Sequence, residues 1–309
     1  EDNYFYRCDG EIEIISLKAG DNDIRRNTFY ESIGTVTCRK NEGNRIYDNF
    51  FIGNQRWGTS GVRMYSKDHI VYNNYFENLN GEKGAIALMY AQPDESAVEN
   101  PEVENITVAF NTMIECEPNI SVGIMYNVAS NRIVPPRNSI IANNLCYKTS
   151  GMMTSLGAGV EGITYIGNLF YGTDLGIDDS SGIDFSDPQL AFSDDLWRLT
   201  TESPAIGAAE GDFEFINHDV DGQDRSDGAK DIGADEYSDT AILNRPLLRE
   251  DVGPEWIWNE NLSLAVFVTL AGTGSGTVLM DPPGGIYAPG TELELIAMPD
   301  EGHQFESWF

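Results

Sequence analysis

Short β-rich runs that lead into asparagine and then into aromatic or aliphatic residues recur along the first part of the chain. Six asparagines mark the recurrence, with steps of 22, 25, 37, 33 and 24 residues between them: Asn27, Asn49, Asn74, Asn111, Asn144 and Asn168. Steps near 22–25, lengthened in two turns, are typical of a solenoid whose coils each add short strands to parallel sheets. Helical periodicity is nearly absent. The pattern predicts an all-β chain that folds as a right-handed parallel β-helix, a single-stranded solenoid.

The recurrent asparagines are expected to be structural. Amide side chains at one turn position of successive coils can stack into a hydrogen-bonded ladder, and asparagine tolerates a left-handed backbone. We therefore assign them to the fold and not to catalysis.

A polar strand face begins at Glu11. Glu11 and Glu13 alternate with isoleucines in a β-branched run, so both carboxylates should lie on one face of the strand. Lys18 lies five residues past Glu13, which is the wrong parity for a straight strand. A bend near Ser16 and Leu17 is therefore needed if Lys18 is to join the carboxylates.

Advancing by one coil relates this strand to basic residues further along. A step of 24 relates Ile15 to Arg39 and Arg63, Glu11 to Thr35, and Glu13 to Thr37. Because stacked coils lie ~4.8 Å apart, Arg39 and Arg63 should be near neighbours beside the glutamates. Stacked guanidinium groups repel each other unless an anion bridges them. The arrangement predicts a site for an anionic ligand, with a solvated arginine pair as the alternative.

Charge narrows the choice of partners. The formal net charge is -31, which argues against nucleic acid as a partner. Residues 1–90 hold 11 Lys+Arg and 13 Asp+Glu (11 − 13 = −2), whereas residues 91–309 hold 8 and 37 (8 − 37 = −29). A polyanion should therefore bind within the first part of the chain, which contains Lys18, Arg39, Lys40, Arg56, Arg63 and Lys83. Uneven surface charge without a function is the alternative.

The four cysteines lack the CxxC spacing of a thiolate metal site. Buried free thiols are favoured for all four over a disulfide. No apolar run is long enough to span a membrane. The chain starts at Glu1 inside a patterned stretch, and we interpret it as a fragment without its N-terminal coils.

The repeat fades after Gly172, and the run from Asp231 to Glu236 is expected to close a first domain over residues 1–237. Within this part, Asn217–Gly222 resembles the start of an EF-hand calcium loop. That loop needs a glutamate six residues beyond its glycine, and Gly228 stands there. A structural turn is therefore favoured over a metal site.

Residues 238–262 are interpreted as a linker, and residues 263–309 as a second, small β domain. Strands are expected over 265–269 and 293–297, between turns rich in Gly and Pro. The order of Gly, Pro, Tyr287 and Trp308 resembles the bacterial extracellular repeat of the internalin B type, and the unit is incomplete. The resemblance implies a stalk, spacer or attachment role.

Residues 1–237 resemble polysaccharide lyase family six, which contains alginate lyases and the dermatan-cleaving chondroitinase B. The resemblance rests on the runs Glu11-x-Glu13-x-x-Ser16-x-Lys18, Arg26-Asn27-Thr28-Phe29, Thr37-Cys38-Arg39, Gly61-Val62-Arg63, His69-x-Val71-x-Asn73-Asn74-Tyr75-Phe76 and Asp231-Ile232-Gly233-Ala234-Asp235-Glu236. Each run alone is common, whereas their order and spacing together are specific.

The resemblance implies a calcium-assisted β-elimination on a 4-linked uronate polymer. Lys18 matches the general base, Arg39 the general acid, and Glu11 and Glu13 two Ca²⁺ ligands. The residues expected to bind further uronates are Arg63, Lys83, His69 and Lys40, and His69 is equally compatible with a turn residue. The chain departs from the family at Arg39-Lys40-Asn41, where Arg-His-Gly is frequent, and at Lys83, where an arginine is frequent.

The chemistry explains these residue types. The C5 proton of a uronate is weakly acidic because it lies beside an ionised carboxylate. Calcium bound through oxygen ligands would neutralise that carboxylate and stabilise the enolate that forms. Lys18 can accept the proton when it is neutral, and Arg39 can stabilise the leaving oxygen electrostatically.

We expect a bacterial enzyme that is secreted, periplasmic or on the cell surface and acts as a monomer on an acidic polysaccharide. Alginate is the expected substrate because most of the family acts on it. The alternatives are a lyase of dermatan or another glycosaminoglycan, and a non-catalytic polysaccharide-binding surface protein. Intact Lys18 and Arg39 favour an enzyme, since a binding protein needs no base.

Overall fold

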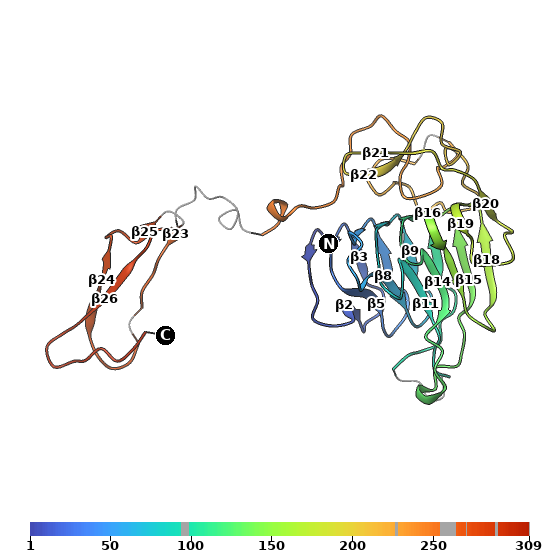
Figure 1. The fold of residues 1–309 in the computed structure, drawn as a ribbon. Helices are drawn as coiled ribbons and strands as arrows, with labels where there is room; N and C mark the ends of the chain where they lie inside the picture. The colour runs from blue at the N-terminus through green and yellow to red at the C-terminus, as the bar shows by residue number, and fades with distance from the viewer. Residues whose placement is uncertain (94–98, 226–227, 254–263, 270, 288–289, 309) are drawn as a thin grey trace. The chain divides into compact units, whose positions relative to one another are not determined.

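The structure is a computed structural model that describes residues 1–93, 99–225, 228–253, 264–269, 271–287 and 290–308. The chain divides into two compact units, Glu1–Leu247 and Leu248–Phe309 (Figure 1). The border between them lies inside the predicted linker 238–262. The exact limits of the predicted domains stay a prediction.

Three parallel sheets form the first unit, and each coil adds one strand to each sheet. Sheet A contains β1 (Tyr4–Tyr6), β4 (Thr28–Tyr30), β7 (Phe50–Ile52), β10 (Tyr75–Glu77), β13 (Thr112–Ile114), β16 (Leu145–Met152), β19 (Asn168–Asp174) and β20 (Ile183–Phe185). Sheet B contains β2 (Glu13–Leu17), β5 (Gly34–Cys38), β8 (Thr59–Met64), β11 (Ile86–Met89), β14 (Ile120–Ile124) and β17 (Thr154–Leu156). Sheet C contains β3 (Asp23–Arg25), β6 (Arg45–Tyr47), β9 (Ile70–Tyr72), β12 (Thr107–Ala109), β15 (Arg137–Ala142) and β18 (Glu161–Ile166). The predicted all-β parallel β-helix is confirmed.

Helical structure in the described part of the chain is limited to two short 3-10 turns, η2 (Val128–Ser130) and η3 (Arg249–Asp251). A search of the same residues finds no helix long and apolar enough to cross a membrane.

The asparagine ladder forms as predicted and starts one coil earlier, at Asn3. Within it, Asn49 Nδ2 donates to Asn74 Oδ1 at 2.9 Å, and Asn74 Nδ2 donates to Asn111 Oδ1 at 3.0 Å. The left-handed backbone belongs to the residue before each ladder asparagine, as at Asp48 (φ 56°) and Phe110 (φ 54°). The sequence-based assignment of that conformation to the asparagines themselves was therefore wrong by one position.

The interior of the solenoid repeats from coil to coil. Phe5, Phe29, Phe51 and Phe76 stack along sheet A with ring centroids 4.5–4.7 Å apart. Parallel pairing in register places one side chain above its equivalent in the next coil, so similar residues at one position bury each other.

The C-terminal part of the first unit covers sheets A and C. It contains the antiparallel hairpin of β21 (Leu190–Ser193) and β22 (Leu196–Leu199). Leu196, Val220 and Ile232 belong to one apolar cluster with residues of sheet A, and Ile216 belongs to another with residues of sheet C. Among the described residues, sheet B contributes to neither cluster. Figure 1 shows this segment on one side of the solenoid, away from β5 and β11.

Arg225 holds the covering segment together from inside. Its guanidinium is fully buried and donates to Glu236 Oε2 at 2.6 Å and to the backbone oxygens of Asp231 and Gly233 at 3.0 and 2.8 Å. It also lies over the Phe110 ring, 5.0 Å from the centroid. The predicted closing run 231–236 is thus tied to the solenoid through this arginine, and also through Gly233 N, which donates to the Asn143 oxygen at 2.9 Å, and Ala234 N, which donates to Thr112 Oγ1 at 2.8 Å.

All four cysteines are free thiols, as predicted. Cys38, Cys116 and Cys146 are buried, and burial raises the pKa of each thiol. Cys8 is exposed, which corrects the prediction that all four are buried.

The second unit contains two antiparallel pairs. They are β23 (Leu264–Ala265) with β25 (Ile286–Tyr287), and β24 (Gly276–Asp281) with β26 (Glu294–Pro299). The last of these strands covers most of the range predicted over 293–297. The strand predicted over 265–269 is limited to Leu264–Ala265.

Replacing Asn111 by alanine should lower the free energy of unfolding by about 3 kcal/mol or more, because several buried backbone and amide groups would lose their partners. Asn111 Nδ2 donates to the oxygens of Val71 and Ala109 at 2.9 and 3.1 Å and to Asn144 Oδ1 at 2.9 Å. Denaturant unfolding measures the loss. Asn217→Ala, at an exposed asparagine, is the control and should change stability by less than about 0.5 kcal/mol. Equal losses in the two variants would contradict a stabilising ladder.

Candidate active site on sheet B

A β-bulge in β2 decides which side chains face outward. Glu13 pairs with Thr35 and Ile15 with Val36, so Ile14 is an extra residue in β2. The extra residue reverses the alternation of inward and outward positions along β2. Lys18 therefore falls on the same outward face as Glu13. The predicted change of parity is present, but it occurs at Ile14 and not near Ser16 and Leu17.

The register of the next coils also differs from a uniform step of 24. Thr37 pairs with Ser16 in one direction and with Arg63 in the other. Glu13 was expected opposite Thr37, and Arg39 opposite Arg63. Both expectations were wrong, because the step between paired residues is not constant: it is 22 from Glu13 to Thr35 and 26 from Thr37 to Arg63. In addition, β2 and β8 each carry one more residue than β5 at an irregularity in pairing.

Arg39 and Arg63 nevertheless converge on Glu13. Arg39 Nη1 donates to Glu13 Oε1 at 2.9 Å, and Arg63 Nη2 donates to the same oxygen. Arg63 also donates from Nε to Thr37 Oγ1 at 3.2 Å and lies over the Tyr65 ring. Only 4% of Arg63 is exposed, so the alternative of a solvated arginine pair does not hold. The anion that bridges the two arginines is the carboxylate of Glu13.

The charge state of Glu13 follows from competing effects. Burial would raise its pKa, but a hydrogen bond from Ser16 and the charges of Arg63 and Arg39 outweigh burial and lower the pKa below 4.5. Glu13 is therefore ionised at neutral pH.

Glu11 lies before β2 and is exposed. The turn that carries it lies close against the next coil, where Thr35 N donates to the Ile12 oxygen at 3.1 Å. Gly34, with φ 115°, permits this approach, because a Cβ there would lie 2.9 Å from the Ile12 carbonyl. Close packing of the two backbones thus fixes the turn that carries Glu11 against Gly34 of the next coil.

Lys18 and Arg39 occupy equivalent places one residue beyond β2 and β5, and Lys18 is exposed. Arg39 N donates to the Leu17 oxygen at 2.8 Å, which continues the pairing of the two strands. Tyr65 and Tyr90 follow β8 and β11 directly in the same way. A lysine, an arginine and two tyrosines therefore gather at the carboxyl edge of sheet B. The sequence alone could not reveal this row, because it depends on where each strand ends.

The floor of sheet B beyond the arginines is lined with small side chains. Ala87, Ser121 and Ser155 continue the outward column that starts at Thr37 and Arg63. Ala87 and Ser121 are buried, with 0% and 1% of their surface exposed, and Ser155 is partly exposed. The sequence analysis missed this floor because the later coils do not follow a fixed step.

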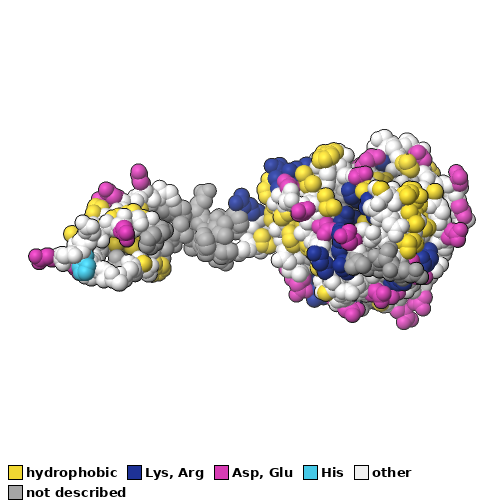
Figure 2. Space-filling view, turned by 90° about the horizontal axis from the view of Figure 1, so that it is seen from below, with side chains coloured by type: hydrophobic (Ala, Val, Ile, Leu, Met, Phe, Trp, Pro, Cys, Tyr) yellow, Lys and Arg dark blue, Asp and Glu magenta, His cyan; other side chains and the backbone are white. Residues whose placement is uncertain are grey.

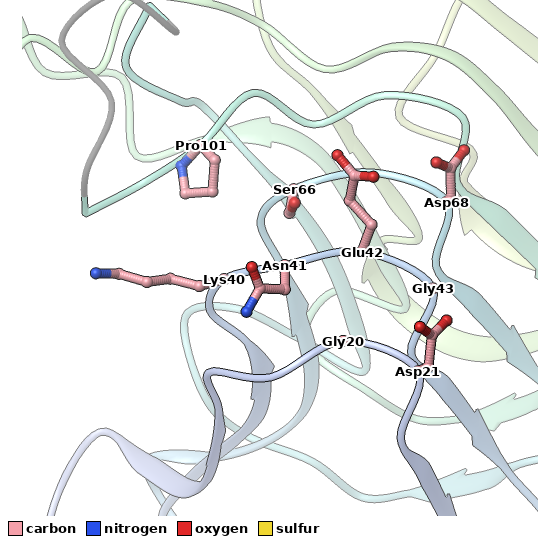
Figure 3. Close-up of a pocket in the computed structure, with 9 residues that line it drawn as sticks. All are labelled: Gly20, Asp21, Lys40, Asn41, Glu42, Gly43, Ser66, Asp68 and Pro101. Atoms are coloured by element: carbon pink, nitrogen blue, oxygen red, sulfur yellow. The ribbon is translucent and has the colours of Figure 1, made fainter.

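Two other predicted binding residues, Lys40 and Lys83, are not part of this cluster. Lys40 lines a cavity of about 820 Å³ together with Asp21, Glu42 and Asp68 (Figure 3). Figure 3 shows the Lys40 side chain directed away from these carboxylates. Because carboxylates dominate its wall, the cavity is unsuited to an acidic sugar. Lys83 Nζ contacts the carboxylate of its neighbour Glu82 at 3.1 Å.

His69 is fully buried and serves a turn, which corrects its prediction as a substrate-binding residue. Its Nδ1 accepts a hydrogen bond from Asn44 N at 3.1 Å, so its Nε2 carries the proton that it donates to the Tyr65 oxygen at 2.8 Å. Burial lowers the pKa of His69 below 6.5. The turn alternative that the sequence left open is the one observed.

Basic side chains are unevenly distributed over the first unit. On the face shown in Figure 2, Lys and Arg lie mostly over the N-terminal coils, and Asp and Glu become more frequent towards the later coils. This agrees with the charge asymmetry of the sequence.

Glu11 and Glu13 fit a hard cation in their donor chemistry. Both offer carboxylate oxygens, and calcium takes six to eight oxygen ligands. Glu13 is ionised, and Glu11 forms no ion pair or hydrogen bond with the described residues. These two side chains would hold such a cation at the edge of sheet B.

Three parallel sheets with one strand from each coil, and a charged cluster at the edge of sheet B, define a parallel β-helix protein. The family model described as Chondroitinase B matches residues 1–207. The chain therefore belongs to the chondroitinase B family and is homologous to family six polysaccharide lyases. A model of the divergent InlB B-repeat domain matches residues 266–309, in the second unit. A search of curated proteins gives no match.

Solved structures of family six lyases resemble the chain. The alginate lyase AlyGC is 31% identical with a TM-score of 0.58, over 64% of this chain and 27% of AlyGC. An arginine-to-alanine mutant of AlyGC matches with 26% identity and a TM-score of 0.63, over 85% of this chain and 32% of the mutant. A mannuronic acid specific family six lyase from human gut microbiota is 29% identical with a TM-score of 0.51, over 60% of this chain and 44% of that lyase. The chain thus spans less than half the length of each.

Replacing Glu13 by glutamine should lower the free energy of unfolding by about 3 kcal/mol, because it leaves the buried Arg63 guanidinium without its carboxylate. Adding Arg63→Met to Glu13→Gln should recover part of that loss. A double-mutant cycle by thermal unfolding measures the coupling. Losses that simply add would show that the two side chains do not depend on each other.

The pH dependence of stability should reveal the neutral His69. A histidine whose folded pKa is lowered contributes stability that is fully present above pH 6.5 and is lost as the pH falls, by up to ~1.4 kcal/mol per pH unit. His69→Asn should flatten that part of the profile, because an asparagine already fills the equivalent turn at Asn44. Melting temperatures of both proteins between about pH 5 and 8 provide the test. Parallel profiles would contradict the assignment.

Proposed function

We propose that this chain is a lyase that cleaves 4-linked uronate polymers, with alginate as its substrate, by calcium-assisted β-elimination. The observation that carries the proposal is the convergence of Arg39 and Arg63 on Glu13 at the edge of sheet B that also holds Lys18. Membership of a lyase family and similarity to an alginate lyase and to a mannuronic acid specific family six lyase support the same reaction.

In the proposed reaction, Lys18 removes the C5 proton of a uronate. The electron pair forms the C4=C5 double bond, the bond from C4 to the bridging oxygen breaks, and solvent protonates that oxygen. Arg39 stabilises the negative charge on the leaving oxygen, as a partly exposed guanidinium can do by donating hydrogen bonds. The products are one new end with an unsaturated uronate and one with a free hydroxyl.

Glu11 and Glu13 would hold calcium, which would supply positive charge to the uronate carboxylate and so acidify the C5 proton. Glu13 has a second role in this proposal, because it fixes Arg39 and Arg63 in place. Arg63 is too buried to move far, so it adds a fixed positive charge beneath the sugar.

The covering segment packs on sheets A and C, whereas at the carboxyl edge of sheet B Lys18 is exposed and Arg39 is partly exposed. The acidic polysaccharide would bind at this edge. We further propose that the chain acts outside the cytoplasm, secreted, periplasmic or on the cell surface, because its second unit matches the InlB B-repeat domain.

The test is formation of the double bond, followed by ultraviolet absorbance with alginate and, separately, with dermatan sulfate. Activity on alginate should be lost with a chelator. Lys18→Ala should lower kcat by about 10²–10⁴-fold, because a positioned base is worth that much. Lys67→Ala is the matched control, since Lys67 contacts Glu104 at 3.7 Å and should leave the rate unchanged.

Activity on dermatan sulfate alone would support the same mechanism with a different substrate. Dermatan sulfate is the specific alternative because the matching family model is described as Chondroitinase B. Binding of either polymer without turnover would overturn the enzyme proposal in favour of a binding protein. Equal rates for Lys18→Ala and the parent chain would reject Lys18 as the base.

A further inference from the structure

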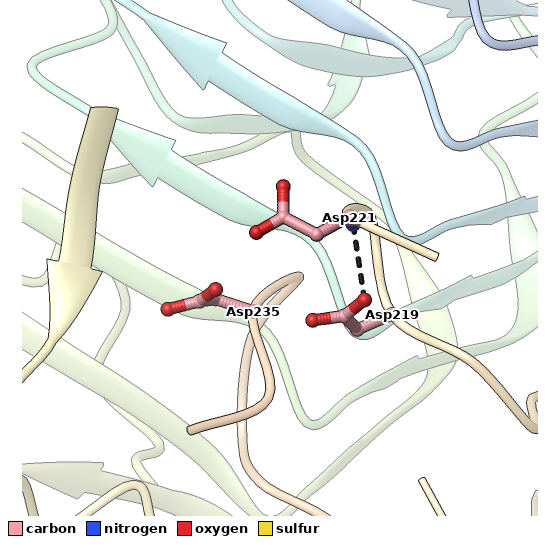
Figure 4. A group of neighbouring side chains, drawn as sticks. All are labelled: Asp219, Asp221 and Asp235. Atoms are coloured by element: carbon pink, nitrogen blue, oxygen red, sulfur yellow. Dashed lines mark hydrogen bonds between the residues drawn. The ribbon is translucent and has the colours of Figure 1, made fainter. Parts of the chain in front are cut away.

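Three buried carboxylates meet in the covering segment, on the side of the solenoid away from sheet B. Asp219, Asp221 and Asp235 each offer an oxygen, and these oxygens lie within 4.8 Å of one another (Figure 4). They come from two separate stretches, the loop 217–222 and the closing run 231–236. Asp219 and Asp221 are fully buried.

One oxygen of this group has no partner. The Asp221 side chain is 0% exposed, and its Oδ1 forms no hydrogen bond with the described residues. Its other oxygen, Oδ2, accepts from Arg198 Nη1. A buried carboxylate oxygen without a donor costs free energy unless a ligand satisfies it. Figure 4 shows the Asp221 carboxylate on the side that faces Asp235.

The local charge is also unbalanced. Arg198 is the cation in direct contact, through Asp221 and through Asp235 Oδ1 at 2.8 Å, so the group with all three carboxylates ionised would carry −3 + 1 = −2. One divalent cation would make the group neutral.

We propose that Asp219, Asp221 and Asp235 form a cation site, separate from sheet B, that binds Ca²⁺. The ligand set contains oxygen only, which suits a hard cation, and its irregular arrangement suits calcium better than magnesium. Asp221 Oδ1 is the ligand that no other described group occupies. Arg198 can stay on Asp221 Oδ2 and Asp235 Oδ1, or shift towards Asp194, whose carboxylate lies 4.0 Å from its Nε.

The local motif alone could not show this site. Counting along the loop from Asp219 leads to Gly228, which has no side chain to offer as a ligand. The fold instead brings Asp235 to Asp219, because Glu236 N donates to Asp219 Oδ2 at 2.9 Å. The third carboxylate therefore arrives through tertiary structure.

A cation here would fasten the end of the first unit. The backbone oxygen of Asp221 accepts from Leu243 N and Asn244 N, both at 2.8 Å, and Leu247 N donates to Thr28 Oγ1 at 2.7 Å. The loop 217–222 thus lies between the closing run and the stretch that leaves the unit. Calcium would hold these three segments together.

Thermal unfolding of the full chain carrying Glu11→Gln tests the site, because this substitution removes a ligand of the calcium proposed on sheet B. Ca²⁺ at about 100 times its dissociation constant should raise Tm by about 5–10 °C over the same protein in a chelator. Adding Asp221→Asn should abolish the rise without lowering Tm in the chelator, since it removes one excess charge. Adding Asp194→Asn, which changes an exposed carboxylate near the same arginine, should preserve the rise.

A Ca²⁺-dependent rise that survives Asp221→Asn, or no rise in the Glu11→Gln chain, would overturn the proposal. If Asp221→Asn fails to fold, equilibrium dialysis of the Glu11→Gln chain decides. One bound Ca²⁺ supports the site, and none overturns it. The lyase assay reports separately on sheet B, so loss of turnover with the Ca²⁺-dependent rise intact would reject only the proposed reaction.

Discussion

Every coil of this solenoid must satisfy the backbone groups of its turns as well as those of its strands. The ladder from Asn3 to Asn168 does this at one corner, where the inner amides from Asn49 to Asn144 each bond both to the next amide and to backbone oxygens of their own and the preceding coil. Buried amides that bond only to one another and to the backbone demand constant spacing between coils. That spacing keeps the phenylalanine stack in contact and aligns the strands of all three sheets.

Because the asparagine ladder keeps the spacing between coils constant, sheet B can contain irregularities in strand pairing without disrupting the solenoid. Sheet A pairs in register over its first coils, whereas sheet B contains irregularities at Ile14 and next to Thr35. These bulges change which side chains point outward, and they bring Lys18 and Arg63 to the face that holds Glu13. Bulges are frequent beside functional sites because they redirect a side chain without breaking the sheet.

The covering segment explains why the candidate active site lies on sheet B. Sheets A and C bury their outer faces beneath residues such as Leu196 and Ile216, and Arg225 anchors that segment through the hydrogen bonds of its buried guanidinium. Sheet B keeps an outer face that is polar, with Glu13 ionised between two arginines. The same segment concentrates carboxylates around Arg198, so one stretch of chain both shields two sheets and creates a second charged centre.

The sequence by itself determined the all-β solenoid, its asparagine ladder and the residue types of the candidate site. These depend on local alternation and on a motif of only a few residues that recurs in every coil. It could not predict the register, since the step between paired residues varies from coil to coil and one extra residue at Ile14 or in β8 shifts the pairs that follow within that strand pair. It therefore placed Arg39 opposite Arg63, and it left His69 open between a binding residue and a turn residue. Only the tertiary structure decided that Glu13 bridges both arginines, that His69 is buried, and that Asp235 meets Asp219. These contacts join segments far apart in the chain, and their distances depend on packing that no local pattern encodes.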